Sequence, residues 1–137
     1  MTSSDNRDLN ERQLSGELKG LLVLVVEDSW EVAAGLTGLL KAWGADVLGP
    51  VATTSDALRL SAERTADAAI VDLSLRDGER AYGLIDRLHD LGIRVVLVSG
   101  YANVSLAEGK VAAILQKPMK PDLLLQSLLS GQNKELQ

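Results

Sequence analysis

The stretch VLVVEDSWEVAAGLTGLL, residues 23–40, decides the fold. It continues an apolar run, LLVLVV at 21–26, that is typical of a strand buried on both faces in a parallel sheet. Glu27 and Asp28 follow the strand directly. Apolar residues then recur at helical spacing as far as Trp43, and the next residue is a glycine that can end the helix. The stretch therefore predicts a strand, an acidic turn and a helix in succession.

The rest of the chain repeats the alternation of strand and helix. Each later apolar run is followed by a turn signal and then by apolar residues at helical spacing. The expected strands span residues 45–50, 67–72, 93–99 and 111–115. Of the later helices, one follows an N-cap at Thr54 or Ser55 and one begins at Ala81. A short helix lies within residues 100–110, and the last helix begins at Pro121. Five β-α units predict an α/β fold with a parallel sheet, right-handed crossovers and helices on both faces.

The composition favours one domain inside the cell. The chain has 137 residues, of which 46% are hydrophobic, with no Phe and no Cys, so we expect an aliphatic core and a reducing compartment. A net charge of −5 without a Lys/Arg cluster argues against binding to nucleic acid or to an anionic membrane. No apolar run approaches the roughly 18 residues of a membrane span, and the N-terminus lacks a secretory signal. We expect a cytoplasmic protein.

Three segments are expected along the chain. Residues 1–19 form a polar leader, residues 20–131 the folded domain, and residues 132–137 a short C-terminal tail. The tail is too short for an appended output domain, so we expect the signal to leave through protein contacts. The last helix carries more leucines than one buried face requires, and Leu125 and Leu129 are the candidates for partner docking or for a homodimer.

Polar side chains stand at the carboxyl ends of the expected strands. Glu27 and Asp28 follow the first strand, and Asp72 ends the third. Ser99 ends the fourth strand, and Lys117 follows the fifth. In a doubly wound sheet, ligands bind outside these ends, so we expect the five side chains to share one rim.

Three carboxylates at one rim repel one another. Two unit charges about 4 Å apart cost roughly 4 kcal/mol at an effective dielectric near 20. A divalent cation removes this cost, and a set of oxygen ligands favours Mg²⁺, which keeps waters that a phosphate can replace. Together with the amine of Lys117 and the hydroxyl of Ser99, this pattern indicates transfer of a phosphoryl group onto a carboxylate.

Four motifs then identify a family. VVEDS, AAIVDLSLRDGE, VVLVSGYA and ILQKPM occur in this order, each at a strand end. On these motifs the chain resembles the receiver domain of two-component response regulators over residues 20–130. The resemblance implies a flavodoxin-like, doubly wound (βα)5 fold with strand order 2-1-3-4-5, and a single-domain regulator that acts in a phosphorelay or as a switch or phosphate sink.

The resemblance also implies how the phosphoryl group is received. Asp72 would accept it from a phosphohistidine on a sensor histidine kinase or a phosphotransfer protein. Ser99 and Lys117 would contact the phosphoryl oxygens, and the bond between Lys117 and Pro118 would be cis. Such a protein is a phosphoacceptor rather than an enzyme, although it assists its own phosphotransfer and autodephosphorylation.

The implied metal is Mg²⁺. Asp28 and Asp72 would bind it directly, the backbone carbonyl of Ser74 would be a third ligand, and Glu27 would act through water.

One position departs from the family pattern. Ile114 stands three residues before the lysine, where relatives usually carry an aromatic switch residue. Tyr101, in the loop after the fourth expected strand, is the candidate aromatic in its place. Two alternative functions stay open: an interaction domain that never takes phosphate, and a phosphatase with an aspartyl nucleophile. The phosphatase is disfavoured because such enzymes place a second Asp where this chain has Ser74.

Overall fold

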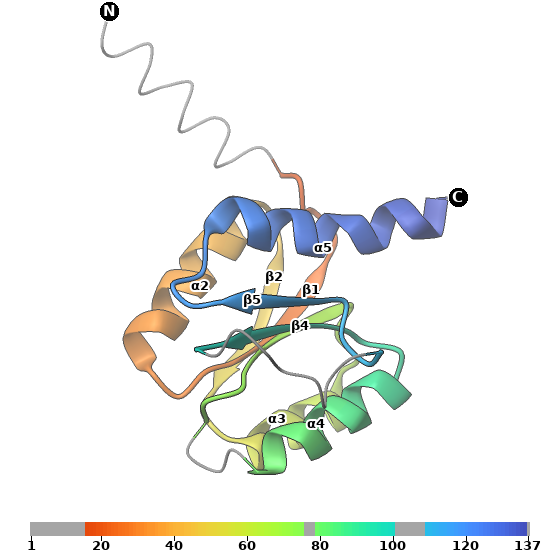
Figure 1. Ribbon diagram of the computed structural model, residues 1–137. Coiled ribbons are helices and arrows are strands. Elements are labelled where there is room, and N and C mark those ends of the chain that lie inside the picture. The colour runs from red at the N-terminus through yellow and green to blue at the C-terminus, as the bar shows by residue number, and fades with distance from the viewer. Residues whose placement is uncertain (1–15, 76–78, 101–108, 137) are drawn as a thin grey trace, which may run out of the picture.

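The computed structural model describes residues 16–75, 79–100 and 109–136. Its strands form one parallel sheet in the order β2-β1-β3-β4-β5 (Figure 1), which confirms the predicted order. Each strand lies within two residues of its expected bounds. The strands are β1 (Leu22–Val26), β2 (Asp46–Val51), β3 (Ala68–Asp72), β4 (Arg94–Ser99) and β5 (Ala113–Gln116).

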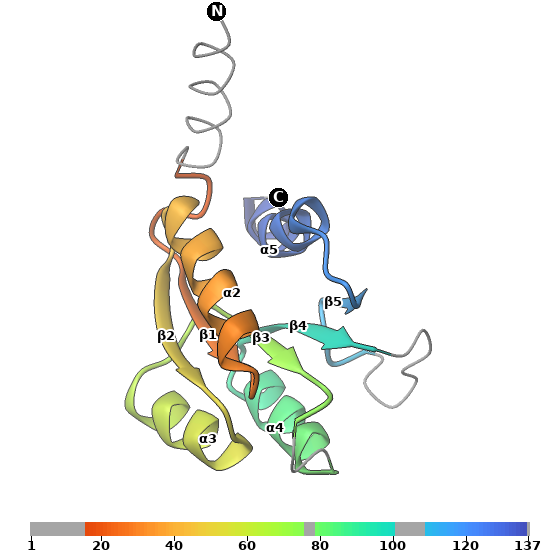
Figure 2. The same ribbon diagram turned by 90° about the vertical axis from the view of Figure 1, so that its left-hand side faces the viewer.

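Helices cover both faces of the sheet, as predicted. α2 and α5 lie on one face, and α3 and α4 lie on the other (Figures 1 and 2). The helix expected within residues 100–110 falls almost wholly on residues 101–108, outside the described part of the chain. The helices are α2 (Trp30–Ala42), α3 (Thr54–Glu63), α4 (Glu79–Asp90) and α5 (Pro121–Leu136).

The central strands explain the two-layered core. Every residue of β1 and of β3 is buried. Because successive strand side chains point to opposite faces, Val23 and Val25 pack in the cluster that includes residues of α2 and α5. Leu22 and Leu24 pack in the cluster that includes residues of α3 and α4. The continuous apolar runs of the sequence therefore fix both faces of the sheet.

The helix starts show one correction. The side chain of Ser29 caps α2 by accepting a hydrogen bond from the backbone of Val32. The cap of α3 is Thr53, whose hydroxyl accepts from the backbone N–H of Asp56 at 3.1 Å, so the expected cap at Thr54 or Ser55 is wrong. Thr53 has the extended backbone of an N-cap residue, whereas Thr54 is already helical and buried.

The two ends of the folded part also differ from the expected segments. Leu18, placed in the polar leader, is completely buried in the core cluster beside α2 and α5. Its backbone N–H donates to the carbonyl of Trp43 at 2.8 Å. At the other end, the residues expected as a tail are helical as far as Leu136.

The leucines of α5 divide between the core and the surface. Leu124 and Leu128 are buried, and Leu125 and Leu129 are half-buried against the same cluster. Among the leucines of α5 whose side chains the structure describes, Leu123 is the exposed one, at 47%. Self-association through Leu125 and Leu129 stays a prediction, and the surplus apolar surface lies at Leu123 instead.

The peptide bond between Lys117 and Pro118 is cis, as predicted, and the bond between Gly49 and Pro50 is also cis. Among the described residues, no helix is long and apolar enough to cross a membrane.

We predict that Leu18→Ala lowers the free energy of unfolding by about 2–5 kcal/mol, because it leaves a cavity in a close-packed core. Leu58→Ala is the control, since Leu58 is 39% exposed on α3, and we expect it to change stability by only about 0.5 kcal/mol. Urea unfolding of the two variants gives the comparison. A loss of unfolding free energy in Leu18→Ala no larger than that in Leu58→Ala would contradict the prediction.

Candidate functional site

The acidic residues predicted to share a rim do lie together. Glu27 and Asp28 follow β1, and Asp72 ends β3, the neighbouring strand at the centre of the sheet. Carboxylate oxygens of all three lie within 4.8 Å of one another. Glu27 is 5% exposed and Asp72 is 3% exposed, so two of the three carboxylates are buried.

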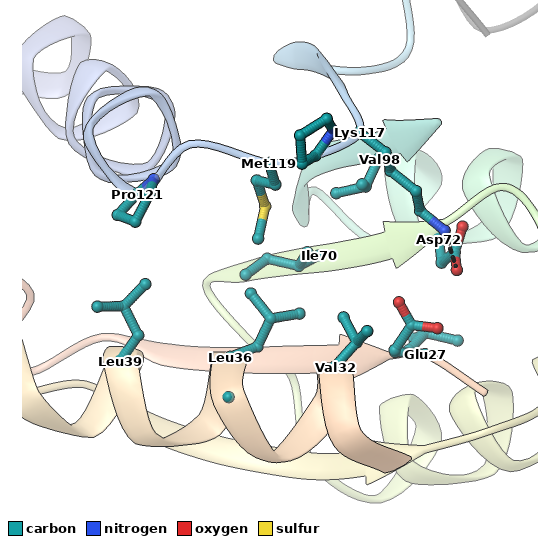
Figure 3. Close-up of a pocket in the computed structure, with 13 residues that line it drawn as sticks. Glu27, Val32, Leu36, Leu39, Ile70, Asp72, Val98, Lys117, Met119 and Pro121 are labelled. Carbon is teal, nitrogen blue, oxygen red and sulfur yellow. Dashed lines mark hydrogen bonds and ion pairs between the residues drawn. The ribbon is translucent and has the colours of Figure 1, made fainter. Parts of the chain in front are cut away.

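Asp72 is held through both of its carboxylate oxygens. The Lys117 Nζ lies 2.9 Å from Asp72 Oδ2 (Figure 3). The backbone N–H of Ser74 donates to Asp72 Oδ1 at 2.8 Å. Lys117 reaches the site from the segment after β5, so the ion pair joins the ends of two strands that β4 separates.

The two buried carboxyl groups differ in protonation. Burial raises the pKa of Glu27 to about 7, against a hydrogen bond from the Ser29 amide, and the nearby Asp72 adds to the rise. Burial also acts to raise the pKa of Asp72, but hydrogen bonds from the Ser74 amide and the Lys117 ammonium outweigh it and leave the pKa of Asp72 below its usual value. As the pH falls, Glu27 therefore binds a proton before Asp72 does, and Asp72 is ionised at neutral pH.

Ser99 lies where the sequence placed it, at the end of β4, and is completely buried. Its backbone carbonyl accepts a hydrogen bond from the Lys117 N–H at 2.8 Å, so the ends of β4 and β5 are tied together. Ile114 is half-buried in β5, against the cluster of α3 and α4. Tyr101 lies outside the described residues. The rim thus brings together Ser99, Lys117 and the acidic cluster.

The acidic cluster fits a hard divalent cation. Glu27, Asp28 and Asp72 offer only oxygen ligands, as Mg²⁺ prefers. Two of the three are buried, where carboxylates gain most from a positive partner. Lys117 supplies one positive charge to Asp72 and leaves the cluster net negative. The donor set is therefore suited to Mg²⁺.

A pocket that sequence analysis did not predict adjoins this rim. It has a volume of about 330 Å³ and runs from the acidic rim between α2 and the start of α5. Val32 lines it and is 45% exposed, although helical spacing places Val32 on the buried face of α2. The spacing could not reveal the pocket, because its opening depends on how far α5 stands from α2. The lining residues are Val26, Glu27, Val32, Gly35, Leu36, Leu39, Ile70, Asp72, Val98, Lys117, Pro118, Met119 and Pro121.

Comparison with known proteins identifies the family. Residues 23–129 match the model of the response regulator receiver domain. A search of curated proteins found no match. The chain therefore belongs to the response regulator receiver family.

Solved structures agree with this assignment. A CheY-like receiver domain protein from Methanospirillum hungatei is 26% identical, with a TM-score of 0.75 over 84% of this chain and 98% of that one. A CheY-like receiver domain from Methylobacillus flagellatus is 28% identical, with a TM-score of 0.65 over 79% and 98%. The response regulator PhyR from Brucella abortus shares the fold at 19% identity, with a TM-score of 0.74 over 99% of this chain and 59% of that one.

Membership of the family defines the general activity. Receiver domains are phosphoacceptor signalling domains rather than classical enzymes, and they interact with histidine kinases or phosphotransfer proteins. They bind Mg²⁺ at an acidic pocket. Glu27, Asp28 and Asp72 form an acidic cluster of this type at the rim.

We predict that Lys117→Ala, without divalent cations, lowers the free energy of unfolding by about 1–3 kcal/mol, because it leaves the buried Asp72 carboxylate without its charged donor. Lys110→Ala is the matched control. Lys110 pairs with Asp86 at 2.6 Å, and both side chains are about half exposed, so we expect a clearly smaller loss than for Lys117→Ala. Urea unfolding of both variants in EDTA tests the difference; a larger loss for Lys110→Ala would contradict it.

Proposed function

We propose that this protein is a response regulator that accepts a phosphoryl group on Asp72 from the phosphohistidine of a sensor histidine kinase or a phosphotransfer protein. The observation that carries the proposal is the state of Asp72. Its carboxylate is ionised and held by Lys117 and the Ser74 amide, at the end of the central strand. A positioned carboxylate is the nucleophile that forms an acyl phosphate.

The transfer is a substitution at phosphorus. An oxygen of Asp72 attacks the phosphorus atom in line with the P–N bond of the donor, and a P–O bond forms as the P–N bond breaks. The electron pair of the P–N bond stays on the imidazole nitrogen, which binds a proton from solvent. The product is an acyl phosphate on Asp72 and a free histidine on the donor.

Lys117 and Ser99 then bind the transferred group. The Lys117 Nζ, now 2.9 Å from the carboxylate, is placed to follow the new negative charge onto the phosphoryl oxygens. Ser99 is tied to Lys117 through the backbone bond between them, and its hydroxyl would donate to another phosphoryl oxygen. Phosphorylation therefore acts on the ends of β4 and β5, from which the change reaches the protein that reads it.

Asp28 and Asp72 would hold Mg²⁺ directly, with Glu27 through water and the Ser74 carbonyl as a third ligand. The acidic cluster supports this set, since the three carboxylates converge within 4.8 Å. Bound Mg²⁺ supplies positive charge that offsets the negative charge of the phosphoryl group. The pKa of Glu27 is raised to about 7, so as the pH falls Glu27 binds a proton before Asp72 does, and the Asp72 carboxylate stays ionised.

We predict that Asp72→Asn abolishes acid-labile phosphorylation by acetyl phosphate, because an amide cannot attack phosphorus to form the acyl phosphate. The control is Asp86→Asn, an exposed carboxylate on α4, which should be labelled like the wild type. Intact-mass spectrometry measures the added phosphoryl group. Labelling of Asp72→Asn at the wild-type level would refute the assignment.

We predict that Asp28→Asn weakens Mg²⁺ binding by about tenfold or more, since a directly bound carboxylate is lost from a small oxygen-ligand site. Asp46→Asn removes an exposed carboxylate from β2 and should leave the affinity unchanged. Isothermal titration calorimetry with MgCl₂ gives both affinities. An unchanged affinity in Asp28→Asn would remove Asp28 from the metal site.

A further inference from the structure

The edge strand β2 carries one residue more than the stretch of β1 opposite it. Figure 2 shows β2 at the edge of the sheet, beside β1. Leu24 pairs with Leu48 and Val26 pairs with Val51, so the register shifts by one residue between these two pairs. In an unbroken register Pro50 would stand opposite Val26. The extra residue makes a β-bulge, which bends the strand and can re-aim a neighbouring side chain.

Gly49 has the backbone that this bulge requires. Its φ is +93°, in the region that glycine adopts without a steric penalty. A Cβ built on Gly49 would lie 2.9 Å from the backbone nitrogen of Val51 and 3.2 Å from the carbonyl oxygen of Val25. Any other residue at this position would therefore push directly on Val51.

The bulge does not fill the core. Gly49 and Pro50 are both exposed. Proline has no N–H to donate and is found in sheets at edges and bulges, so the pair can protect the edge of the sheet against pairing with another chain. A second role follows from the hydrogen bond that the next residue makes.

Val51 ties the bulge to the acidic rim. Its backbone carbonyl accepts a hydrogen bond from the N–H of Glu27 at 2.9 Å. The pairing of β1 with β2 and with β3 ends at Val26, so this bond holds the first residue beyond the paired strand. The Glu27 carboxylate in turn accepts from the N–H of Ser29 at 3.1 Å. Asp28 therefore lies between two residues whose backbone amides are both held.

Resting on the proposed function, we propose that Gly49 is a positioning residue for the Mg²⁺ site. The bulge places the Val51 carbonyl where it holds the Glu27 amide. That bond sets the direction in which Glu27 and Asp28 leave β1, toward Asp72 on the neighbouring strand. Groups that orient metal ligands control the affinity for the metal without contacting it. Gly49 acts in this way, through Val51.

The experiment moves the bulge with a single methyl group. Gly49→Ala places a Cβ against the backbone of β2. Gly44→Ala is the matched control, because Gly44 has a φ of +94° and its Cβ would lie 2.9 Å from the Cα of Gly16. Gly44 precedes β2, at the end of the strand away from the rim. Isothermal titration calorimetry with MgCl₂ measures the affinity. Without metal, hydrogen exchange by NMR compares the amide of Glu27 with that of Leu24 inside β1.

We expect Gly49→Ala to weaken Mg²⁺ binding by about tenfold or more. Exchange of the Glu27 amide, relative to that of Leu24, should become faster by about tenfold, because the bond to Val51 opens locally. Gly44→Ala should keep both quantities within about twofold of the wild type.

A wild-type affinity in Gly49→Ala, or equal losses in both variants, would overturn the proposal and leave edge protection as the role of the bulge. Failure of the wild type itself to bind Mg²⁺ would instead refute the proposed metal site, and the positioning role of Gly49 with it.

A second variant keeps the test decisive if Gly49→Ala does not fold. Pro50→Gly adds no atoms, but it frees the φ angle that proline fixes, so the bulge is held less firmly. We expect Mg²⁺ binding to weaken by about threefold, with faster exchange of the Glu27 amide. Wild-type affinity in Pro50→Gly would overturn the proposal.

Discussion

The ion pair between Lys117 and Asp72 is the interaction on which the rest of the rim depends. It spans 2.9 Å but joins residues that are 45 positions apart in the chain. The parallel sheet makes this possible, because the order β1-β3-β4-β5 carries the ends of four strands to one edge. Without Lys117, Asp72 would keep the Ser74 amide as a donor but would lose its ammonium partner while buried beside the carboxyl of Glu27, which is costly in a medium of low dielectric. The ammonium that stabilises Asp72 in the core is also the group to which the proposed function assigns the phosphoryl oxygens.

The same pair resolves the conflict between the two buried carboxyl groups. Two neighbouring carboxylates ionise together only at a cost in free energy, so the one with fewer donors binds a proton first as the pH falls. Glu27 has a single amide donor at 3.1 Å, and its pKa is raised to about 7. Asp72 has an amide and an ammonium group, and its pKa is lowered. Asp72, at the centre of the sheet, is therefore the residue whose carboxylate is ionised at neutral pH.

Sequence alone could predict these residues because apolar runs fix their positions. Asp72 ends a strand that is buried throughout, so only its place at the rim remained possible. Other features could not be predicted, either because neighbouring residues are equally good caps or because the feature depends on packing between distant segments. Thr53, Thr54 and Ser55 are all good caps, and packing of Thr54 into the interior decides for Thr53. Leu18 lies in a polar segment whose composition gives no sign that this one residue is buried. Helical periodicity does not predict the pocket, because it assigns Val32 to one face of α2 but does not show whether another helix covers that face.

The pocket and the ion pair between Lys117 and Asp72 share one segment of chain. Residues 117–121 supply the amine that binds Asp72 and, through Met119 and Pro121, one wall of the pocket. Lys117 is itself part of the pocket wall, so a shift of its amine toward a phosphoryl group on Asp72, as the proposed function requires, changes the shape of that wall. By linkage, any molecule that contacts this wall and binds one state of Asp72 more tightly than the other must favour that state to the same extent.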